Sequence, residues 1–506
     1  MKLDRPLFSR RWMGACSVAL LATASLILTP ALSQAQSRKD SVVLGMILEP
    51  TSLDPTMAPA AAIGEIVHYN IFEGLTKINV DGSVSPLLAE SWKMDADGKA
   101  FTFKLRKGVK FSDGSAFDAE AVKFSFERAK AEKSTNKAKG AVFNNISHIA
   151  TPDAHTVVLV LNNPDGNFLF RMGENTAVIL HPGSAANAAT KPVGTGPYKL
   201  DNWAKGSAVT LSKSDNYRDP AAIKIKKVTF RFINDSAAQV AALLAGDIDG
   251  MPRFQSPQSL KQFQADKRFV VEMGSTAGKG IMTINNRKKP FDDVRVRRAL
   301  SYAVDKKAFI DGVFEGLAKP IGSHMAPTDA GYVDLSGQYA YDPEKAKALL
   351  KEAGVQTPLN VTLTLPPPPY ARKGGEILAA QLAKVGIVAK IENVEWAQWL
   401  GGTFKGNFDL TVINHVEPLD YMNYANPNYY WGYDSKAFRD LAAKHSEASG
   451  KERTKLFGDM QRLIANDAVN VFLFNASNTA VYRKGLKGLW SSSPIFANDM
   501  AAVSWQ

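Results

Sequence analysis

The pattern of apolar and polar positions alternates between short strands and capped helices along most of the chain. Residues 101–105 (FTFKL) place every second side chain on one face, which predicts a half-buried strand. Asp118 then caps a predicted helix that runs to about residue 130. Strands alternating with helices in this way predict an α/β protein.

The second half of the chain carries the clearest helix signals. Residues 342–354 begin with Asp342 as an N-cap and Pro343 at the first helical position, and they end at Gly354. A second predicted helix, 376–385, leads through a glycine into a predicted strand at 387–391. A helix that feeds directly into a strand is typical of an α/β layer.

A third predicted helix follows Asp293 and has one apolar stripe. The stripe consists of Val296, Leu300, Ala303 and Val304. The arginines between these positions are expected to point into solvent, because helical periodicity places them off the apolar stripe. They are Arg295, Arg297 and Arg298.

The N-terminus has the pattern of a secretion signal. A basic head precedes an apolar run at 16–28, and small residues at 33–35 (SQA) form a cleavage site, so we expect residues 1–35 to be removed. The apolar run is too short for a membrane anchor, which needs about 20 apolar residues. Arg10 and Arg11 leave twin-arginine export open. The mature protein is therefore expected in the periplasm.

Composition after this cleavage limits the chemistry of the mature chain. Its 471 residues (506 less 35) exceed what one core holds, which predicts two or more lobes. The net charge falls from +12 to +9, because four basic residues and one acid are removed. Lysines interleaved with acids give no reason to expect nucleic acid as a partner. Cys16, the only cysteine, lies in the signal, so the mature chain has no thiol.

No catalytic or cofactor motif is found in the sequence. The seven histidines do not have the spacing that places two imidazoles on one metal ion, so we expect neither a metal site nor a cofactor. Residues 134–137 (STNK) match a Ser-x-x-Lys pattern without its partner motifs, which a chain of this length produces by chance. A site built from distant carboxylates would leave no motif, so a secreted hydrolase stays an alternative.

Aromatic and polar residues concentrate late in the chain. Residues 395–399 (EWAQW) follow a predicted strand, and residues 415–433 combine tyrosines and a tryptophan with His415, Glu417 and Asp420. Such side chains suit a cleft that recognises a small polar molecule. The alternative is a loop held on the core by aromatic side chains.

Seven segments in order resemble one known family, the extracellular solute-binding proteins of family 5. The resemblance covers nearly all of the mature chain, and the segment 193–198 includes Tyr198. They are residues 49–55 (EPTSLDP), 70–75 (NIFEGL), 88–92 (LAESW), 105–114 (LRKGVKFSDG), 193–198 (VGTGPY), 246–249 (GDID) and 294–305 (VRVRRALSYAVD).

The resemblance implies a two-lobed periplasmic binding protein-like fold with a ligand cleft between the lobes. Lobe I is discontinuous and comprises 41–278 and 476–506, with an inserted subdomain at about 81–190; lobe II comprises 279–475. Residues 281–286 and 471–474 are expected to be the strands that cross between the lobes. A hinge of this kind closes over a ligand and buries it.

The resemblance also implies candidate ligand contacts. Arg372 matches the position that pairs with a peptide carboxylate, a task that a guanidinium group suits, and Trp396 matches a tryptophan that lines the cleft. Asn414 stands where peptide binders have an aspartate for the ligand ammonium, so either Glu417 or Asp420 replaces it or the ligand is not an ordinary free-amine peptide. The full set of expected ligand-binding residues is Glu49, Tyr198, Arg372, Trp396, Trp399, Asn414, His415, Glu417, Asp420 and Tyr421.

The function that the resemblance implies is solute capture for an ABC importer. The expected ligand is a small peptide or peptide-like solute, and the expected partners are the permease subunits, with the binding protein itself a monomer and not an enzyme. An opine, an oligosaccharide and a nickel or other metal chelate are alternative ligands within the same fold. His415 adds to the last of these, although any such metal would need its own chelator.

Overall fold

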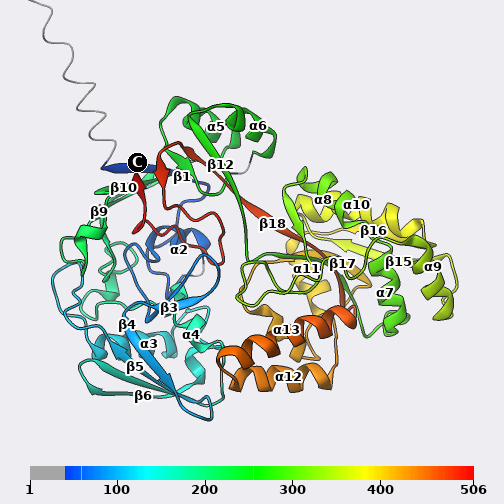
Figure 1. Ribbon diagram of the computed structural model, residues 1–506, viewed down its shortest axis with the longest axis horizontal. Helices are drawn as coiled ribbons and strands as arrows, with labels where there is room; N and C mark the ends of the chain where they lie inside the picture. The colour runs from blue at the N-terminus through cyan, green and yellow to red at the C-terminus, as the bar shows by residue number, and fades with distance from the viewer. Residues whose placement is uncertain (1–39, 59, 255) are drawn as a thin grey trace, which may run out of the picture.

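The computed structural model describes residues 40–58, 60–254 and 256–506. The chain forms two lobes side by side (Figure 1). We use lobe I for residues 40–275 and 477–506, and lobe II for residues 279–474; the expected limits of these units stay predictions. The expected signal segment, 1–35, lies outside the described residues. Among the described residues, no helix has the length and apolar character needed to cross a membrane.

Lobe I is built on one half of a long mixed sheet. Strand β1 (Ser41–Met46) lies parallel to β10 (Lys227–Phe232), and β9 (Ala208–Lys213) and β8 (Tyr198–Ala204) extend the sheet antiparallel. The C-terminus returns beside β1, where the Trp505 indole donates to the Ser41 carbonyl at 2.9 Å. Alternating side chains of β1 and β10, such as Val42, Leu44 and Phe230, are fully buried in this core.

A second, smaller sheet of lobe I lies within the expected range 81–190. Its four antiparallel strands have the order β4 (Ala89–Met94), β5 (Ala100–Leu105), β7 (Thr156–Leu161), β6 (Ile146–Asp153). Helix α3 (Ala119–Lys130) packs on this sheet, and the Asp118 carboxylate accepts the Ala121 amide at 3.1 Å. The predicted strand at 101–105 and the helix capped by Asp118 are confirmed.

Lobe II contains the other half of the long sheet. Its strands include β13 (Lys279–Ile284), β15 (Leu359–Leu365), β16 (Ile387–Asn393) and β17 (Leu410–His415). Helices α7 (Val294–Tyr302), α8 (Lys306–Phe314) and α9 (Pro343–Glu352) pack around it, with α12 (Lys436–Glu447) and α13 (Gly450–Asn466) toward lobe I. The predicted helix at 342–354 and the strand after Gly386 are confirmed.

Helix α10 (Pro369–Ala383) begins seven residues before the predicted start at 376. The prediction was wrong because Gly374 and Gly375 lower helix propensity. The two glycines instead permit close packing. A Cβ on Gly374 would lie 2.6 Å from the Phe309 ring of α8, and one on Gly375 would lie 2.3 Å from Leu365 of β15.

Arg297 corrects the expectation that all three arginines of α7 are solvated. Its side chain is buried, and Nη1 donates to the Phe291 carbonyl at 2.9 Å while Nη2 donates to the Asp467 carbonyl at 2.9 Å. Helical periodicity does not reveal that Arg297 is buried. A guanidinium group can be buried where it donates to carbonyls at helix ends that would otherwise lack hydrogen-bond donors. Arg295 and Arg298 keep more contact with solvent.

The lobes are joined at two adjacent crossings. Strand β18 (Asn470–Arg483) pairs with β13 in lobe II and then with β12 (Phe269–Ser275) in lobe I. The second crossing runs through 276–278, earlier than the predicted 281–286, which belong to the lobe II side. The Asn475 amide donates to the carbonyls of Thr276 and Gly278, both at 2.7 Å, and so ties the two crossings together. We call residues 276–278 and 475–476 the hinge.

Candidate functional site

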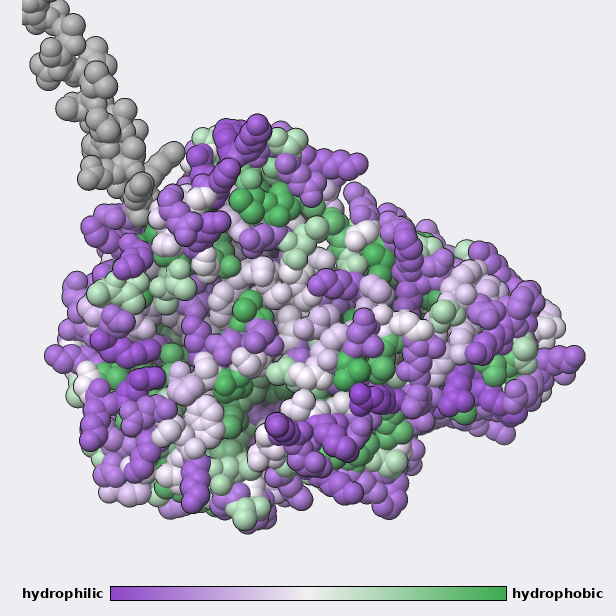
Figure 2. Space-filling view, in the orientation of Figure 1, coloured by the Kyte–Doolittle hydropathy of each residue, from purple (hydrophilic) through white to green (hydrophobic). Residues whose placement is uncertain are grey.

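A cavity of about 470 Å³ lies between the lobes and against the hinge. Figure 2 shows the surface hollowed between the lobes. We call the cavity of about 470 Å³ the hinge cavity. Both lobes and the hinge contribute to its wall, so a rotation about the hinge changes its shape. The wall consists of Ala61, His68, Lys137, Glu174, Asn175, Arg253 and residues 493–496 of lobe I, Thr276, Ala277, Gly278 and Ala476 at the hinge, and Asn414, Val416, Glu417 and Pro418 of lobe II.

A second space of about 510 Å³, the outer cavity, also lies between the lobes but has no hinge residue in its wall. Here the lobes touch. The Asn167 side-chain oxygen of lobe I accepts from the Tyr421 hydroxyl at 3.1 Å and from Arg453 Nη2 at 2.5 Å, both in lobe II. Gly166 makes this approach possible, because a Cβ there would lie 1.9 Å from Arg453 Nη1. The outer cavity is therefore bounded by a direct contact between the lobes.

Asn414 and Glu417 reach the hinge cavity from the end of β17. The Asn414 amide nitrogen of the main chain donates to the Tyr370 hydroxyl at 3.1 Å, while its buried side-chain Oδ1 has no hydrogen bond among the described residues. Glu417 is exposed, and its Oε2 accepts from the Val416 amide at 3.1 Å. Lobe II thus offers a neutral amide and a carboxylate to the cavity.

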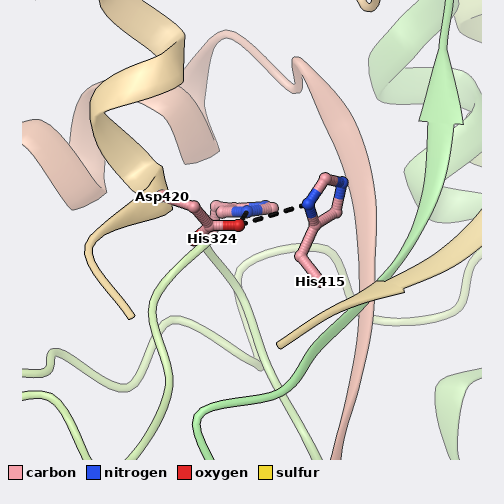
Figure 3. A group of neighbouring side chains, drawn as sticks. All are labelled: His324, His415 and Asp420. Atoms are coloured by element: carbon pink, nitrogen blue, oxygen red, sulfur yellow. Dashed lines mark hydrogen bonds and ion pairs between the residues drawn. The ribbon is translucent and has the colours of Figure 1, made fainter. Parts of the chain in front are cut away.

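Asp420 is buried beneath this segment and already has protein partners (Figure 3). Its carboxylate lies 2.7 Å from Lys279 Nζ, 3.0 Å from His324 Nε2 and 3.2 Å from His415 Nδ1. Burial alone would raise the pKa of Asp420, but the charge of Lys279 and the bond from His324 outweigh it and hold the pKa well below its usual range. Asp420 is therefore an ionised carboxylate whose charge the protein itself balances.

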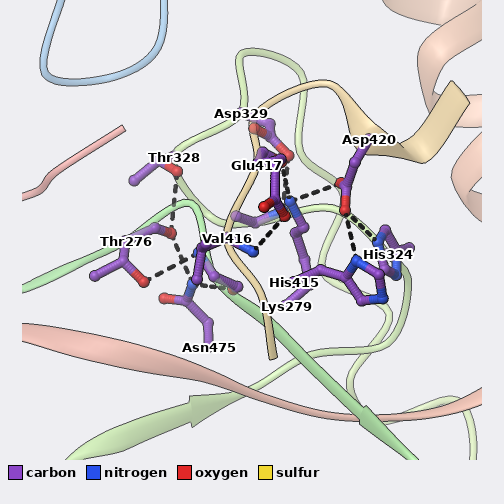
Figure 4. A network of polar contacts seen from close by, with 12 residues as sticks. Thr276, Lys279, His324, Thr328, Asp329, His415, Val416, Glu417, Asp420 and Asn475 are labelled. Carbon is purple, nitrogen blue, oxygen red and sulfur yellow. Dashed lines mark hydrogen bonds and ion pairs between the residues drawn. The ribbon is translucent and has the colours of Figure 1, made fainter. Parts of the chain in front are cut away.

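Lys279 connects this buried group to the cavity wall (Figure 4). Besides its ion pair with Asp420, its Nζ donates to the Glu417 carbonyl at 2.7 Å. On the side of the His415 ring away from Asp420, Nε2 and the Tyr430 hydroxyl lie 2.9 Å apart. The network fixes the main chain from which Glu417 projects.

The donor atoms of His324, His415 and Asp420 lie within 4.8 Å of one another, close enough to hold a metal ion. The sequence does not suggest this group, because His324 is 91 positions before His415 and only the fold brings them together. The chemistry does not favour a metal here. Lys279 already neutralises Asp420, so a divalent cation would add uncompensated charge to a buried site. The group is better explained as a hydrogen-bonded support.

The aromatic residues after 415 mostly form core. Tyr424, Tyr430 and Trp431 are buried in one cluster of lobe II, as is Trp399, whose indole donates to the Thr411 hydroxyl at 3.0 Å. Of the expected ligand contacts in this group, Tyr421 reaches the outer cavity. The alternative of a loop held on the core by aromatic side chains describes most of this segment.

Four other expected ligand contacts are not in the wall of the hinge cavity. Glu49 accepts from the Trp203 indole at 2.9 Å within lobe I, and the fully buried Tyr198 donates to the Ile225 carbonyl at 3.1 Å. Arg372 pairs with Glu395, Nη2 to Oε1, at 3.1 Å. Trp396 is 41% exposed on α11 (Trp396–Gly401). None of these four belongs to the wall of the hinge cavity or of the outer cavity.

Three charged residues of the hinge cavity were missed in the sequence. Lys137, Glu174 and Arg253 come from separate segments of lobe I. Lys137 ends the Ser-x-x-Lys match that chance explains, and the other two lie in no motif. No signal in the sequence marks them, because only the packing of lobe I brings them to one wall.

Three buried histidines with lowered pKa values make the free energy of unfolding depend on pH. Burial lowers the pKa of His68 and His445 to about 3 and that of His324 to about 4. The unfolded chain binds these protons near pH 6.5, so these groups lower the free energy of unfolding as the pH falls from about 6.5 to 4. We expect His445→Phe to flatten this dependence by up to about 1.4 kcal/mol per pH unit.

Urea unfolding between pH 7 and 4 measures this effect. The Phe replacement suits the site, because the His445 ring lies 5.7 Å from Phe457 in a stacked arrangement. His148→Gln changes an exposed histidine of β6 and serves as the control. An unchanged slope in His445→Phe would contradict the assignment.

Comparison with known proteins places these features in a family. Residues 83–437 match the model of the bacterial extracellular solute-binding proteins, family 5 middle. The chain is 30% identical to the dipeptide-binding protein of Escherichia coli (strain K12), with 87% of this chain and 90% of that protein covered.

Two solved structures are similar over almost the whole chain. One is the periplasmic binding protein DppA from Helicobacter pylori in complex with the peptide STSA, with a TM-score of 0.72, 28% identity and coverage of 94% of this chain and 99% of that one. The other is AgaA in complex with agropinic acid from Agrobacterium tumefaciens ("A.tumefacien R10"), with a TM-score of 0.72, 27% identity and coverage of 92% and 98%. Both comparisons agree with two lobes around a ligand cleft.

Proposed function

The chain belongs to the bacterial extracellular solute-binding proteins of family 5, and we propose that it is the periplasmic binding component of an ABC importer for a small peptide or peptide-like solute. The observation that carries this proposal is the hinge cavity. Its volume of about 470 Å³ falls in the range of sites for small molecules, and both lobes contribute charged side chains to its wall.

The ligand ammonium is assigned to Glu417. Asn414 is neutral and supplies only hydrogen bonds. Asp420 was the other expected replacement for the aspartate of peptide binders, but its charge is balanced by Lys279 at 2.7 Å and it is not in the cavity wall. Glu417 is the lobe II carboxylate that does line the cavity.

Closure about the hinge converts binding into a signal for the importer. A ligand that contacts both lobes stabilises the conformations in which the lobes lie close, because only there are both sets of contacts made. The permease subunits then bind the closed form and receive the ligand unchanged. The protein acts by stoichiometric binding, as a monomer and without turnover.

Glu417→Gln tests the ammonium assignment. The variant keeps the size of the side chain but removes its charge, so we expect at least about tenfold weaker binding of an unblocked dipeptide, within the range for charged hydrogen-bonded pairs. Calorimetry measures this with the dipeptide that most stabilises the wild type in a thermal-shift screen.

The N-acetylated form of the same dipeptide is the internal control. It has no ammonium, so its affinity should be nearly the same for the wild type and Glu417→Gln. Equal loss for both peptides would show that Glu417 acts on the fold of the cavity instead of on the ligand charge.

An opine is the second candidate ligand. The similar structure of AgaA holds agropinic acid, and the cationic side chains of the hinge cavity suit a carboxylate of either compound class. Agropinic acid therefore belongs in the same thermal-shift screen.

A further inference from the structure

Four charged side chains line the hinge cavity, and three of them come from lobe I. These are Lys137, Glu174 and Arg253, while Glu417 comes from lobe II. Neither the Lys137 ammonium nor the Glu174 carboxylate has a hydrogen bond or ion pair within the part of the chain that the structure describes, although each is within electrostatic reach of the other. Unpaired charges in a closing cavity cost free energy unless the ligand supplies partners.

Glu174 attracts the Lys137 ammonium only weakly. Burial raises the pKa of Glu174, against the opposing charges of Arg171 and Lys137. The Glu174 carboxyl therefore holds its proton more readily than an exposed carboxyl does. Lys137 is exposed on the cavity side, and its ammonium remains available to an anion.

Arg253 is held rigidly at the same wall. Its Nε lies 3.0 Å from Glu65 Oε1, its Nη2 donates to the Ser493 hydroxyl at 2.9 Å, and its guanidinium lies over the Phe496 ring at 4.7 Å. These contacts leave Nη1 without a hydrogen bond among the described residues. A guanidinium fixed in this way presents its remaining donor at low entropic cost.

Arg372, the expected partner of a ligand carboxylate, already has a partner within lobe II. It is on α10, where Nη2 contacts Glu395 at 3.1 Å, and it is not part of the cavity wall. The lobe II side of the cavity offers Asn414 and Glu417 instead, neither of which attracts an anion. The positive charge in this cavity is therefore on lobe I.

We propose that the ligand is a small zwitterion whose free carboxylate is bound by Lys137 and Arg253 of lobe I, with its ammonium toward Glu417 of lobe II. This inference rests on the proposed function and sets the orientation of the ligand in the same cavity. Each charge of the ligand then contacts a different lobe. A compound that lacks either charge contacts one lobe well and the other poorly, so it stabilises closure less.

The test compares an unblocked dipeptide with its C-terminal amide in the wild type, Lys137→Met and Arg372→Met. The wild type should bind the amide at least about tenfold more weakly than the free acid. Lys137→Met should lose at least about tenfold for the free acid and less than about twofold for the amide, because only the free acid has the charge that Lys137 contacts. Arg372→Met should match the wild type for both compounds.

Two further variants serve as controls for Lys137→Met. Lys137→Arg keeps the charge and should retain most of the affinity for the free acid, while Lys137→Gln repeats the loss if Lys137→Met folds poorly. Thermal unfolding of each variant checks the fold, and the exposed position of Lys137 predicts little change.

The outcomes separate this inference from the proposed function. If the wild type binds no peptide of two to five residues and no opine, the proposed function fails. If the wild type binds the free acid and Lys137→Met and Lys137→Gln bind it equally well, the inference is overturned while the proposed function stands. Selective loss in Arg372→Met, with Lys137→Met unaffected, likewise overturns the inference and assigns the carboxylate to lobe II.

Discussion

Lys279→Met is expected to lower the free energy of unfolding by about 3–5 kcal/mol, the usual cost of removing one partner from a buried ion pair. The Lys279 and Asp420 side chains are only 2% and 7% exposed, so water cannot replace the lost ammonium. The same variant removes the bond from Nζ to the Glu417 carbonyl. We therefore expect weaker ligand binding as well, because the main chain that positions Glu417 loses its anchor. Urea unfolding and calorimetry measure the two effects.

The double variant Lys279→Met/Asp420→Asn is the matched control for the ion pair. It removes both charges, so it should recover part of the stability that the single variant loses. The asparagine can still accept a hydrogen bond from His324 or His415. A single variant within about 0.5 kcal/mol of the wild type would show that the pair contributes no more than a surface contact.

Arg218→Met is expected to cost about 3–5 kcal/mol for the same physical reason in lobe I. Arg218 bonds Glu73 with both arms of its fork, Nη1 to Oε2 at 2.7 Å and Nη2 to Oε1 at 2.8 Å, and Glu73 is buried. The Thr195 hydroxyl donates to the same carboxylate at 2.9 Å. Removal of Arg218 leaves Glu73 buried without a cation. Chemical unfolding of the ligand-free protein measures the loss.

Arg218→Lys separates charge from geometry in this pair. An ammonium keeps the charge but replaces the two parallel bonds with one, so an intermediate loss is expected. The double variant Glu73→Gln/Arg218→Met should be more stable than Arg218→Met alone. If Arg218→Met and the wild type unfold at the same urea concentration, the buried pair is not a determinant of lobe I stability.

Local signals in the sequence predicted individual elements well. Asp118 and Asp342 cap the helices that were expected of them, because a capping carboxylate acts on amides within three residues. The predicted start of α10 was wrong, because Gly374 and Gly375 permit close packing against Phe309 and Leu365, which are distant in the sequence. Arg297 was misplaced for a related reason, since its acceptor at Asp467 lies 170 positions away.

Family resemblance supplied the lobes and the cleft but only part of the site. Two of its motifs have a physical explanation in the structure, because the Thr195 hydroxyl of residues 193–198 donates to the Glu73 carboxylate of residues 70–75, which also pairs with Arg218. Asn414 and Glu417 were expected at the cavity and line it. Lys137, Glu174 and Arg253 were not, since each is an isolated charge whose place depends on how lobe I packs.

Capture of a small zwitterionic peptide-like solute is tested most directly by mass spectrometry of the small molecules released on denaturing protein purified from its native periplasm. We predict about one equivalent of an unmodified peptide of two to five residues with a free amine and a free carboxylate. A ligand without those two charged groups, such as a neutral oligosaccharide, would contradict the account of the hinge cavity.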